Sequence, residues 1–377
     1  MTEKEHAPRI PVFDGHNDTL LSLLTTGRDF FAESDMGHID WPRARRGGLA
    51  GGFFAVFVPD PARLSEKKKV SLEELLGSDP DDLILTNENG PTLAFAQQFA
   101  MAEIAALLRI ETGDGTPFRR KKKRLVTRDD WDTVTPVITA RDLREQIEND
   151  EFSAILHFEG AEMIDTRFNA LETFYEAGLR SLSIAWSRSN VFGHGVPFAF
   201  PSSPDTGPGL TSAGKALVRA CNELGIMIDV SHLNEAGFWD VVDSTSKPVV
   251  ASHSNAHAIC PSSRNPTDKQ LDAIRDSDGL VGLNFNVPFL RPDGERDTAM
   301  PLDVMADHVD YLVKRIGLDR VALGSDFDGA LMPDDLSDAS KLPNLMDTLR
   351  QRGYDDDALR KIGYQNWIRV LELTWGI

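Results

Sequence analysis

The sequence predicts an α/β fold, a (β/α)8 barrel of the TIM type, with a long insertion between its second and third strands. Two observations lead to this prediction. Eight short apolar runs rich in β-branched residues recur along the chain, and helical patterns separate most of them. Near-continuous apolar strands are typical of a parallel sheet that helices cover on both faces. Eight strand–helix repeats in 377 residues fit one closed barrel.

The predicted strands are eight runs that share an apolar, β-branched composition. An open, doubly wound sheet is the alternative fold. It would need a switch point and usually a glycine-rich phosphate loop, and no G-x-G-x-x-G motif follows any of these runs. In chain order the runs are PVFD (11–14), GGFFAVFV (51–58), SAILHFEG (153–160), RSLSIAWS (180–187), IMIDVSH (226–232), PVVASHS (248–254), LVGLNFNV (280–287) and RVALGSDFD (320–328).

Helical patterns precede several of these strands. Residues 169–178 read NALETFYEAG and end at a glycine, which is the residue preferred just after a helix. The segment 211–225 opens with Thr-Ser, either of which can cap a helix, and closes on another glycine. Residues 271–279 and 301–317 lead into the seventh and eighth strands. The alternation of strand and helix therefore continues to the last predicted strand.

The insertion covers residues 59–152 and is far longer than an ordinary connection in such a barrel. It contains an amphipathic helix candidate at 92–110 and a second one at 139–150. Between them, RRKKKR at 119–124 invites a nucleic-acid interpretation, but a solvated loop is favoured in a chain whose formal net charge is −19. We expect residues 1–377 to form one domain that includes this insertion.

Composition limits the classes of function. The chain is 41% hydrophobic and 26% charged, as in ordinary globular proteins, and its negative charge argues against a nucleic-acid partner. With only Cys221 and Cys260, any metal must be held by histidine and carboxylate. The N-terminus lacks an apolar signal region, and no uninterrupted apolar run approaches the ~20 residues of a membrane span. These features predict a soluble, cytoplasmic protein without a membrane partner.

Polar residues that can bind metal follow five of the predicted strands. In DGHND, the side chains of His16 and Asp18 point to the same face of an extended chain. A single histidine at a strand end is more often a hydrogen-bonded structural residue, as we expect for His157, His257 and His308. The active site of a (β/α)8 barrel lies at the carboxyl ends of its strands, so six such residues in phase predict a site. They are His16, Asp18, Glu159, His232, His253 and Asp326.

The number of candidate ligands suggests two metal ions. Five protein ligands are too many for one catalytic zinc that keeps an open position, but a bridging Glu159 gives each of two ions three protein ligands. Two ions roughly 3.5–4 Å apart can hold a hydroxide between them and polarise a carbonyl. Asp326 remains as the general acid/base for the attacking water and the leaving amine. We therefore expect two Zn²⁺ or similar divalent ions per chain, bridged by Glu159 and a hydroxide.

The sequence resembles the membrane (renal) dipeptidase family, binuclear zinc peptidases of the amidohydrolase superfamily. The resemblance implies that His16, Asp18 and Glu159 bind one zinc, and that Glu159, His232 and His253 bind the other. It also implies that Asp326 is the general acid/base, and that the chain forms a homodimer. Arg264 would pair with the substrate's C-terminal carboxylate, a surface salt bridge being the alternative. The matching segments are DGHND (14–18), FEG (158–160), GIMIDVSHLN (225–234), PVVASHSNA (248–256), SRNPTD (263–268) and GSDFDG (324–329).

The fourth predicted strand departs from the family pattern. The family's strand usually ends LTH, and its histidine binds the region of the scissile carbonyl; here IAW places Trp186 at that position. An indole donates one hydrogen bond but carries no charge, so we expect Trp186 to alter substrate binding. His194 could take the role, although a loop residue is the favoured interpretation. Related enzymes bridge their metals with a carboxylated lysine on this strand. Residues 180–190 contain no lysine, so Glu159 is the expected bridge.

Three functions are consistent with these residues. The favoured one is a zinc dipeptidase that cleaves small dipeptides with a free C-terminal carboxylate, with a D-residue at that end as one option. The same metals could instead hydrolyse another small amide, such as an N-acyl amino acid or a lactam. A degenerate metal-binding sensor is the third, and only Trp186 speaks for it.

Overall fold

The computed structural model describes residues 9–60, 86–87, 90–111, 134–137 and 139–376. The basic run at 119–124 and most of the polar N-terminal segment lie outside these residues, as do parts of the insertion at 59–152. That the whole chain forms one domain therefore stays a prediction.

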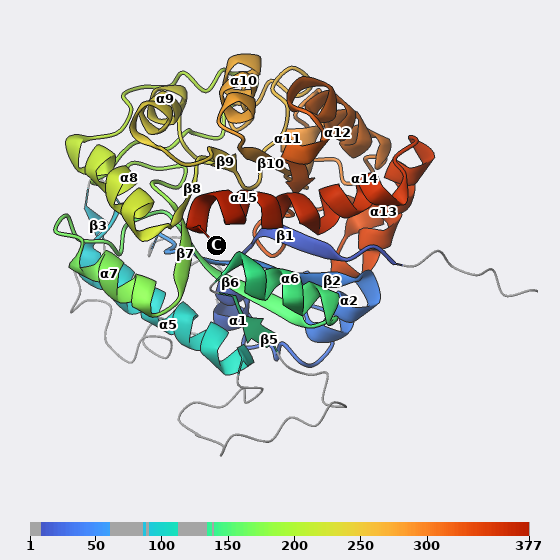
Figure 1. The fold of residues 1–377 in the computed structure, drawn as a ribbon, viewed down its shortest axis with the longest axis horizontal. Coiled ribbons are helices and arrows are strands. Elements are labelled where there is room, and N and C mark those ends of the chain that lie inside the picture. Colours follow the sequence, from blue (N-terminus) through green and yellow to red (C-terminus); the bar gives the residue numbers. More distant parts are fainter. Residues whose placement is uncertain (1–8, 61–85, 88–89, 112–133, 138, 377) are drawn as a thin grey trace, which may run out of the picture.

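Eight parallel strands form a nearly closed barrel, which confirms the predicted fold (Figure 1). The strands pair in the order β1-β2-β6-β7-β8-β9-β10-β11. The first and last strands of this order, β1 and β11, approach each other at one β-bridge between Asn17 and Phe327. There, Asp18 N–H also donates to Phe327 O at 2.8 Å. The strands are β1 (Val12–Asn17), β2 (Leu49–Val56), β6 (Phe152–Glu159), β7 (Leu179–Ser183), β8 (Met227–Asp229), β9 (Val250–Ala251), β10 (Leu280–Leu283) and β11 (Val321–Leu323).

The later strands are shorter than predicted. The predicted run 226–232, for example, leaves the sheet after Asp229. The side chain of Asp229 accepts hydrogen bonds from the backbone N–H groups of Ser231 (3.0 Å) and Ser252 (2.9 Å), which replace further sheet bonds. Three short strands of the described residues, all within the insertion, were not predicted. β5 (Val134–Pro136) pairs in parallel with β6. β3 (Thr86–Asn87) and β4 (Gly90–Pro91) pair with each other in antiparallel orientation.

Helices cover the outside of the barrel, and every helix that we predicted is present with small shifts at its ends. Thr211 caps α8 by accepting from Gly214 N–H at 3.1 Å, and Gly225 ends it in a left-handed conformation, as the sequence suggests. The helices of the described residues are α1 (Thr19–Thr26), α2 (Trp41–Gly47), α5 (Leu93–Glu111), α6 (Ala140–Glu148), α7 (Asn169–Glu176), α8 (Ser212–Leu224), α9 (Glu235–Ser244), α10 (Asp268–Asp276), α11 (Val287–Leu290), α12 (Asp303–Ile316), α13 (Leu342–Gln351), α14 (Asp356–Arg360) and α15 (Asn366–Trp375), with short turns of helix η2 (Leu318–Arg320), η3 (Asp334–Leu336), η4 (Ala339–Lys341) and η5 (Lys361–Gln365).

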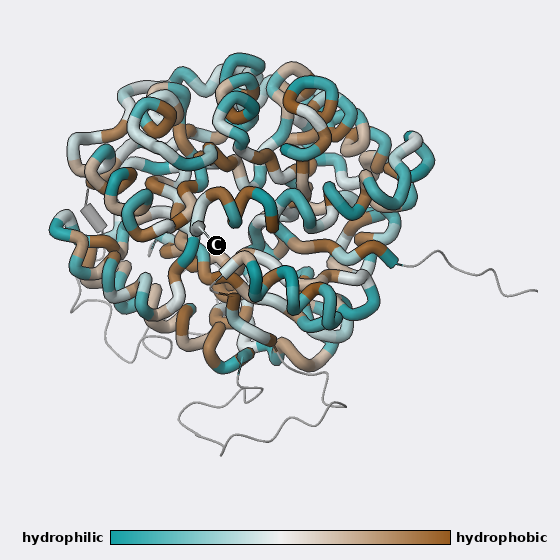
Figure 2. The backbone as a smooth tube through the Cα atoms, in the orientation of Figure 1, coloured by the Kyte–Doolittle hydropathy of each residue, from teal (hydrophilic) through white to brown (hydrophobic). Residues whose placement is uncertain are grey.

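The C-terminal helix α15 fills one end of the barrel. It crosses the middle of the ring of strands in Figure 1. Its Trp367 is fully buried among inward-facing side chains such as Phe13 and Phe53, and the indole N–H donates to Leu323 O at 3.1 Å. Figure 2 shows apolar segments gathered on the strands and polar segments on the outer faces of the helices. Because α15 occupies the end at which the strands begin, the opposite rim is left for the site.

Helix α5 is the one described helix that is long and apolar enough, by length and composition, to cross a membrane. Half of its apolar window is buried inside the protein, including Phe95, Phe99 and Leu107. Burial in the protein core accounts for its apolar composition.

Candidate metal centre and active site

The carboxyl ends of five strands bring all six predicted residues to one rim of the barrel. His16 lies in β1 and Asp18 directly follows it, Glu159 ends β6, and the other three follow β8, β9 and β11. Glu159 lies at the centre of this group. Its Oε1 is 2.8 Å from His232 Nε2, 3.6 Å from His16 Nε2 and 3.8 Å from His253 Nε2. A single carboxylate oxygen therefore faces three imidazoles.

The donor atoms fit divalent metal ions. Zn–N bonds of about 2.0–2.1 Å place two donors of a tetrahedral ion about 3.3 Å apart. The distances from Glu159 Oε1 to the imidazoles span this value, and Nε2 of His232 is 2.9 Å from Nε2 of His253. Within the described residues, neither ring nitrogen of His16 nor Oδ1 of Asp18 has a hydrogen-bond partner, although all three atoms are buried. Bound metal would satisfy such atoms, which are otherwise costly to bury.

Two overlapping groups of side chains, which share His16, each bring donor atoms close enough for one ion. One group is His16, Glu159 and His253, and the other is His16, Asp18 and Asp326; within each group the donor atoms lie within 4.8 Å of one another. The predicted division differs, because it places Glu159 with His16 and Asp18 and leaves Asp326 outside. The proximity of Asp326 to this pair of ligands suits a group that exchanges protons beside the metal.

Electrostatics also favour a cation here. Burial alone would lower the pKa of His16, but the negative charges of Glu159, Asp18 and Asp326 outweigh it and raise that pKa to about 10. Burial raises the pKa of Glu159 well above its ordinary value. Burial, with the positive charge of Arg264 nearby, lowers the pKa of His232 and of His253. The lowered pKa values favour neutral imidazoles at His232 and His253, and neutral imidazole is the form that binds metal.

A second layer of hydrogen bonds orients the metal-facing imidazoles. His253 Nδ1 lies 2.7 Å from Ser252 Oγ, which lies 2.6 Å from Asp229 Oδ2. On the other side, His232 Nδ1 lies 2.9 Å from Ser187 Oγ. Because the carboxylate of Asp229 can only accept, the chain through Ser252 places the ring proton of His253 on Nδ1 and leaves Nε2 free for metal. Asp229 was not among the predicted site residues; its only signal in the sequence is a carboxylate inside an otherwise apolar strand.

Asp229 is not itself available to an ion. It lies near His16 and His157 in a third possible metal group. Its two oxygens, however, already accept five hydrogen bonds of 2.6–3.0 Å, from Ser183, Ser231 and Ser252. His157 Nδ1 is 2.9 Å from the hydroxyl of Ser181, and burial lowers the pKa of His157 to about 3. His157 therefore lies in the barrel interior with a hydrogen-bond partner, as expected of a structural histidine.

Asp326 is held at the rim by a strained backbone. Its φ of 62° lies in the left-handed region, and its N–H donates to His16 O at 2.9 Å. Asn284 Nδ2 donates to Oδ2 at 2.9 Å, so the other carboxylate oxygen is the one left for proton transfer. Burial raises the pKa of Asp326. A Cβ at Gly329 would overlap Oδ2 of Asp18, which explains the glycine in GSDFDG.

Arg264 lies against the centre and is 3% exposed, so a surface salt bridge does not describe it. Its Nη2 is 3.2 Å from His232 Nε2, its Nη1 donates to Ser231 O, and its guanidinium lies 5.7 Å from the centre of the Phe289 ring. Burial lowers its pKa to about 10, which leaves the group charged at neutral pH. This cation is therefore in place beside the proposed metal ligands.

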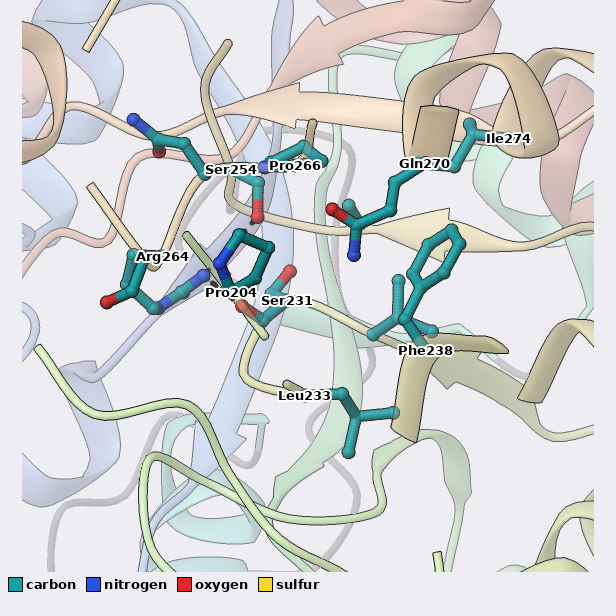
Figure 3. A pocket seen from close by; sticks show the side chains of 13 residues that line it. Pro204, Ser231, Leu233, Phe238, Ser254, Arg264, Pro266, Gln270 and Ile274 are labelled. Carbon is teal, nitrogen blue, oxygen red and sulfur yellow. Dashed lines mark hydrogen bonds between the residues drawn. The ribbon is translucent and has the colours of Figure 1, made fainter. Parts of the chain in front are cut away.

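A small cavity of about 20 Å³ lies behind Arg264, between the strand ends and helices α9 and α10. Figure 3 shows Arg264 at one end of it and Phe238 and Ile274 at the other. This volume is enough for about one water molecule.

Trp186, three residues beyond β7, points toward the metal ligands. Its ring centre is 5.9 Å from that of His232, 5.0 Å from Phe57 and 5.6 Å from Phe198. The downstream His194 is partly buried, with Nδ1 2.8 Å from Ser189 Oγ. The indole thus occupies the edge of the site where the resemblance expects an imidazole.

Residues 3–374 match the family described as membrane dipeptidase, peptidase family M19. The chain is 43% identical to a solved structure described as the dipeptidase AC, a metallo peptidase of family M19, with a TM-score of 0.84 over 98% of this chain and 100% of that one. A metallo peptidase from Rhodobacter sphaeroides, solved with a phosphinate mimic of the dipeptide L-Ala-D-Ala, is 44% identical with a TM-score of 0.84 over 97% and 100% of the chains. The dipeptidase aclJ of Aspergillus oryzae is 29% identical over 96% of this chain and 78% of its own.

Proposed function

Because the chain belongs to the membrane dipeptidase family, peptidase family M19, and is a metal-dependent dipeptidase, we propose that it is a binuclear zinc enzyme. Its substrates are small dipeptides with a free C-terminal carboxylate, and it hydrolyses their amide bond. The observation that carries this proposal is the position of Glu159, whose Oε1 lies 2.8–3.8 Å from Nε2 of His16, His232 and His253. A shared carboxylate at this point can join two ions.

The residues that would hold the ions are His16, Asp18, Glu159, His232 and His253. When bound, two ions supply an activated water and polarise the scissile carbonyl. The carboxylate of Asp326 accepts the proton of the attacking water on the oxygen that Asn284 does not occupy, and it then donates this proton to the leaving amine. Its raised pKa suits a group that must hold a proton between these two steps.

Arg264 binds the C-terminal carboxylate of the substrate in this proposal. The guanidinium is buried, charged and 3.2 Å from a proposed metal ligand, so a carboxylate on it places the adjacent amide bond near the ions. A planar guanidinium can pair with both oxygens of a carboxylate. The mimic of L-Ala-D-Ala bound to the Rhodobacter sphaeroides relative supports a dipeptide, and it favours a D-residue at the C-terminus of the substrate.

The test is a screen of the purified, zinc-loaded protein against L-L, L-D and D-L dipeptides, with N-acyl amino acids and dipeptide amides for comparison. We expect release of free amino acids from dipeptides, and little from dipeptide amides, which lack the carboxylate. An Asp326→Asn sample prepared in parallel controls for contaminating peptidases. Faster hydrolysis of N-acyl amino acids or lactams than of any dipeptide would overturn the substrate assignment, and metal binding without any hydrolysis would identify a sensor.

A cytoplasmic location and a homodimeric assembly stay predictions of the sequence and of the resemblance. Size-exclusion chromatography with light scattering would test the assembly: a mass near twice the 41.7 kDa of the chain is expected, and a monomer would contradict it.

A further inference from the structure

Three aromatic side chains form a continuous surface beside the metal centre, which we call the aromatic wall: Trp186, Phe198 and Phe289. The ring of Phe198 lies 5.6 Å from that of Trp186 and 5.7 Å from that of Phe289, centre to centre. It also lies 6.5 Å from the ring of His232. Phe198 is nevertheless 56% exposed, the highest value among the large apolar side chains of the described residues. An exposed aromatic face beside catalytic groups needs an explanation, because removing its apolar surface from water is energetically favourable.

Backbone hydrogen bonds fix Phe198 in this place. Val196 N–H, two residues before it, donates to His232 O at 2.8 Å. Ala199 N–H, directly after it, donates to Ser263 Oγ at 3.0 Å, and Ser263 N–H donates back to Ala199 O at 3.0 Å. The segment that carries Phe198 is thus joined both to a proposed metal ligand and to the residue that precedes Arg264. The exposed ring is held by the site itself.

The aromatic wall extends along the site, with an arginine at each end. At one end, the guanidinium of Arg264 lies over the Phe289 ring at 5.7 Å. At the other end, Arg188 lies 5.4 Å from the centre of the Trp186 ring. The charge of Arg188 is compensated by Glu162, whose Oε1 accepts from Nε at 2.7 Å. The wall therefore offers an apolar surface between Arg188, whose charge Glu162 compensates, and Arg264, which the proposed function assigns to the substrate carboxylate.

We propose that the aromatic wall binds the side chain of the C-terminal residue of the dipeptide and selects apolar side chains there. This inference rests on the proposed function, because it needs the carboxylate of that residue on Arg264. The side chain and the carboxylate leave the same Cα atom, so a carboxylate on Arg264 puts the side chain within reach of Phe289 and Phe198. An apolar side chain removes the exposed face of Phe198 from water. A charged side chain would lose hydration there and would find no free group of opposite charge to pair with.

The test compares kcat/KM for dipeptides that share an N-terminal L-Ala and end in Gly, Ala, Leu or Asp, in the stereochemistry that the enzyme accepts. For the zinc-loaded wild type we expect Leu to exceed Gly by about tenfold or more, as for a few methylenes in an apolar subsite. Phe198→Ala should reduce this ratio to within about threefold. The matched control is Phe200→Ala: Phe200 is also exposed (40%), but its ring packs on Gly294 instead of the wall, and the ratio should stay as in the wild type.

A second variant tests the wall by gain of function. Phe198→Glu introduces a negative charge at an exposed position. It should raise kcat/KM for a dipeptide that ends in Lys, relative to one that ends in Leu, by at least tenfold. Circular dichroism and Tm equal to those of the wild type establish that each variant is folded. An unchanged Leu/Gly ratio in Phe198→Ala, or a wild-type preference for C-terminal Asp, would overturn the wall as the subsite. Failure of the wild type to cleave any dipeptide would overturn the proposed function instead, so the two failures are distinguishable.

Discussion

Replacing Asp229 by asparagine changes one atom beneath the metal centre, and it should weaken metal binding through a change in the proton position on His253. The ionised carboxylate of Asp229 can only accept hydrogen bonds, so the hydroxyl of Ser252, 2.6 Å away, donates to it. A hydroxyl has one proton, and Ser252 Oγ must therefore accept from His253 Nδ1 at 2.7 Å. This leaves Nε2 of His253 unprotonated and free to bind a metal ion.

The asparagine side chain keeps one oxygen, which the two backbone N–H groups of Ser231 and Ser252 will hold in the position of Oδ1. Its NH₂ group then faces the Ser252 hydroxyl and donates to it. The hydroxyl turns and donates to His253 Nδ1, which moves the ring proton to Nε2. Loss of a partner in the second layer of a metal site typically lowers metal affinity by about 10–100-fold, or roughly 1.4–2.8 kcal/mol.

The assay is competition for zinc between the metal-free protein and a fluorescent chelator, with calorimetry as a second readout. Asp240→Asn is the matched control. Asp240 lies on the outer helix α9, where its carboxylate accepts a hydrogen bond from Leu210 N–H at 2.8 Å and does not contact the metal centre. Zinc affinity should fall in Asp229→Asn and stay at the wild-type value in Asp240→Asn. An Asp229→Asn protein that is folded and binds both ions with wild-type affinity would refute the reasoning.

Three further substitutions test the roles assigned to single side chains. Asp326→Asn should keep the metal content and lower kcat by roughly 10²–10⁴-fold; wild-type activity would assign proton transfer to another group. Arg264→Ala should lower kcat/KM for dipeptides more than tenfold, since an unpaired buried charge costs about 2–5 kcal/mol, and equal losses on dipeptide amides would assign Arg264 to the fold. Trp186→His should lower kcat/KM for the preferred dipeptide at unchanged metal content, because the indole belongs to the aromatic wall. A gain in activity would show that Trp186 merely stands in for a histidine.

The convergence of the site could be predicted from the sequence because it depends on strand direction alone. Parallel strands in a closed barrel end at one rim, so residues at the ends of separate apolar runs meet there. His16, Glu159 and His253 come together for this reason, although the first two are 143 positions apart in the sequence. The same logic predicted α8, whose cap at Thr211 and terminal glycine at Gly225 are local signals.

Other features depend on tertiary contacts that no local pattern records. Asp229 and Asn284 each carry a polar side chain inside an apolar segment, and their roles emerge only when Ser252 and Asp326 are brought beside them. Helix α15 has an ordinary amphipathic sequence, but its place in the end of the barrel follows from the fit of Trp367 among the inward-facing side chains. The short β5 forms because β6 offers it an edge, which its own three residues do not reveal.

The metal content of Glu159→Ala tests the central claim most directly. Purified wild-type protein, loaded with zinc and freed of excess by gel filtration, should contain about two equivalents by elemental analysis. Glu159→Ala should retain little of either ion, because the carboxylate that faces His16, His232 and His253 is removed. Glu172→Ala, on the exposed face of α7, should keep both. A folded Glu159→Ala protein that retains one full equivalent at wild-type affinity would contradict a bridging role for Glu159.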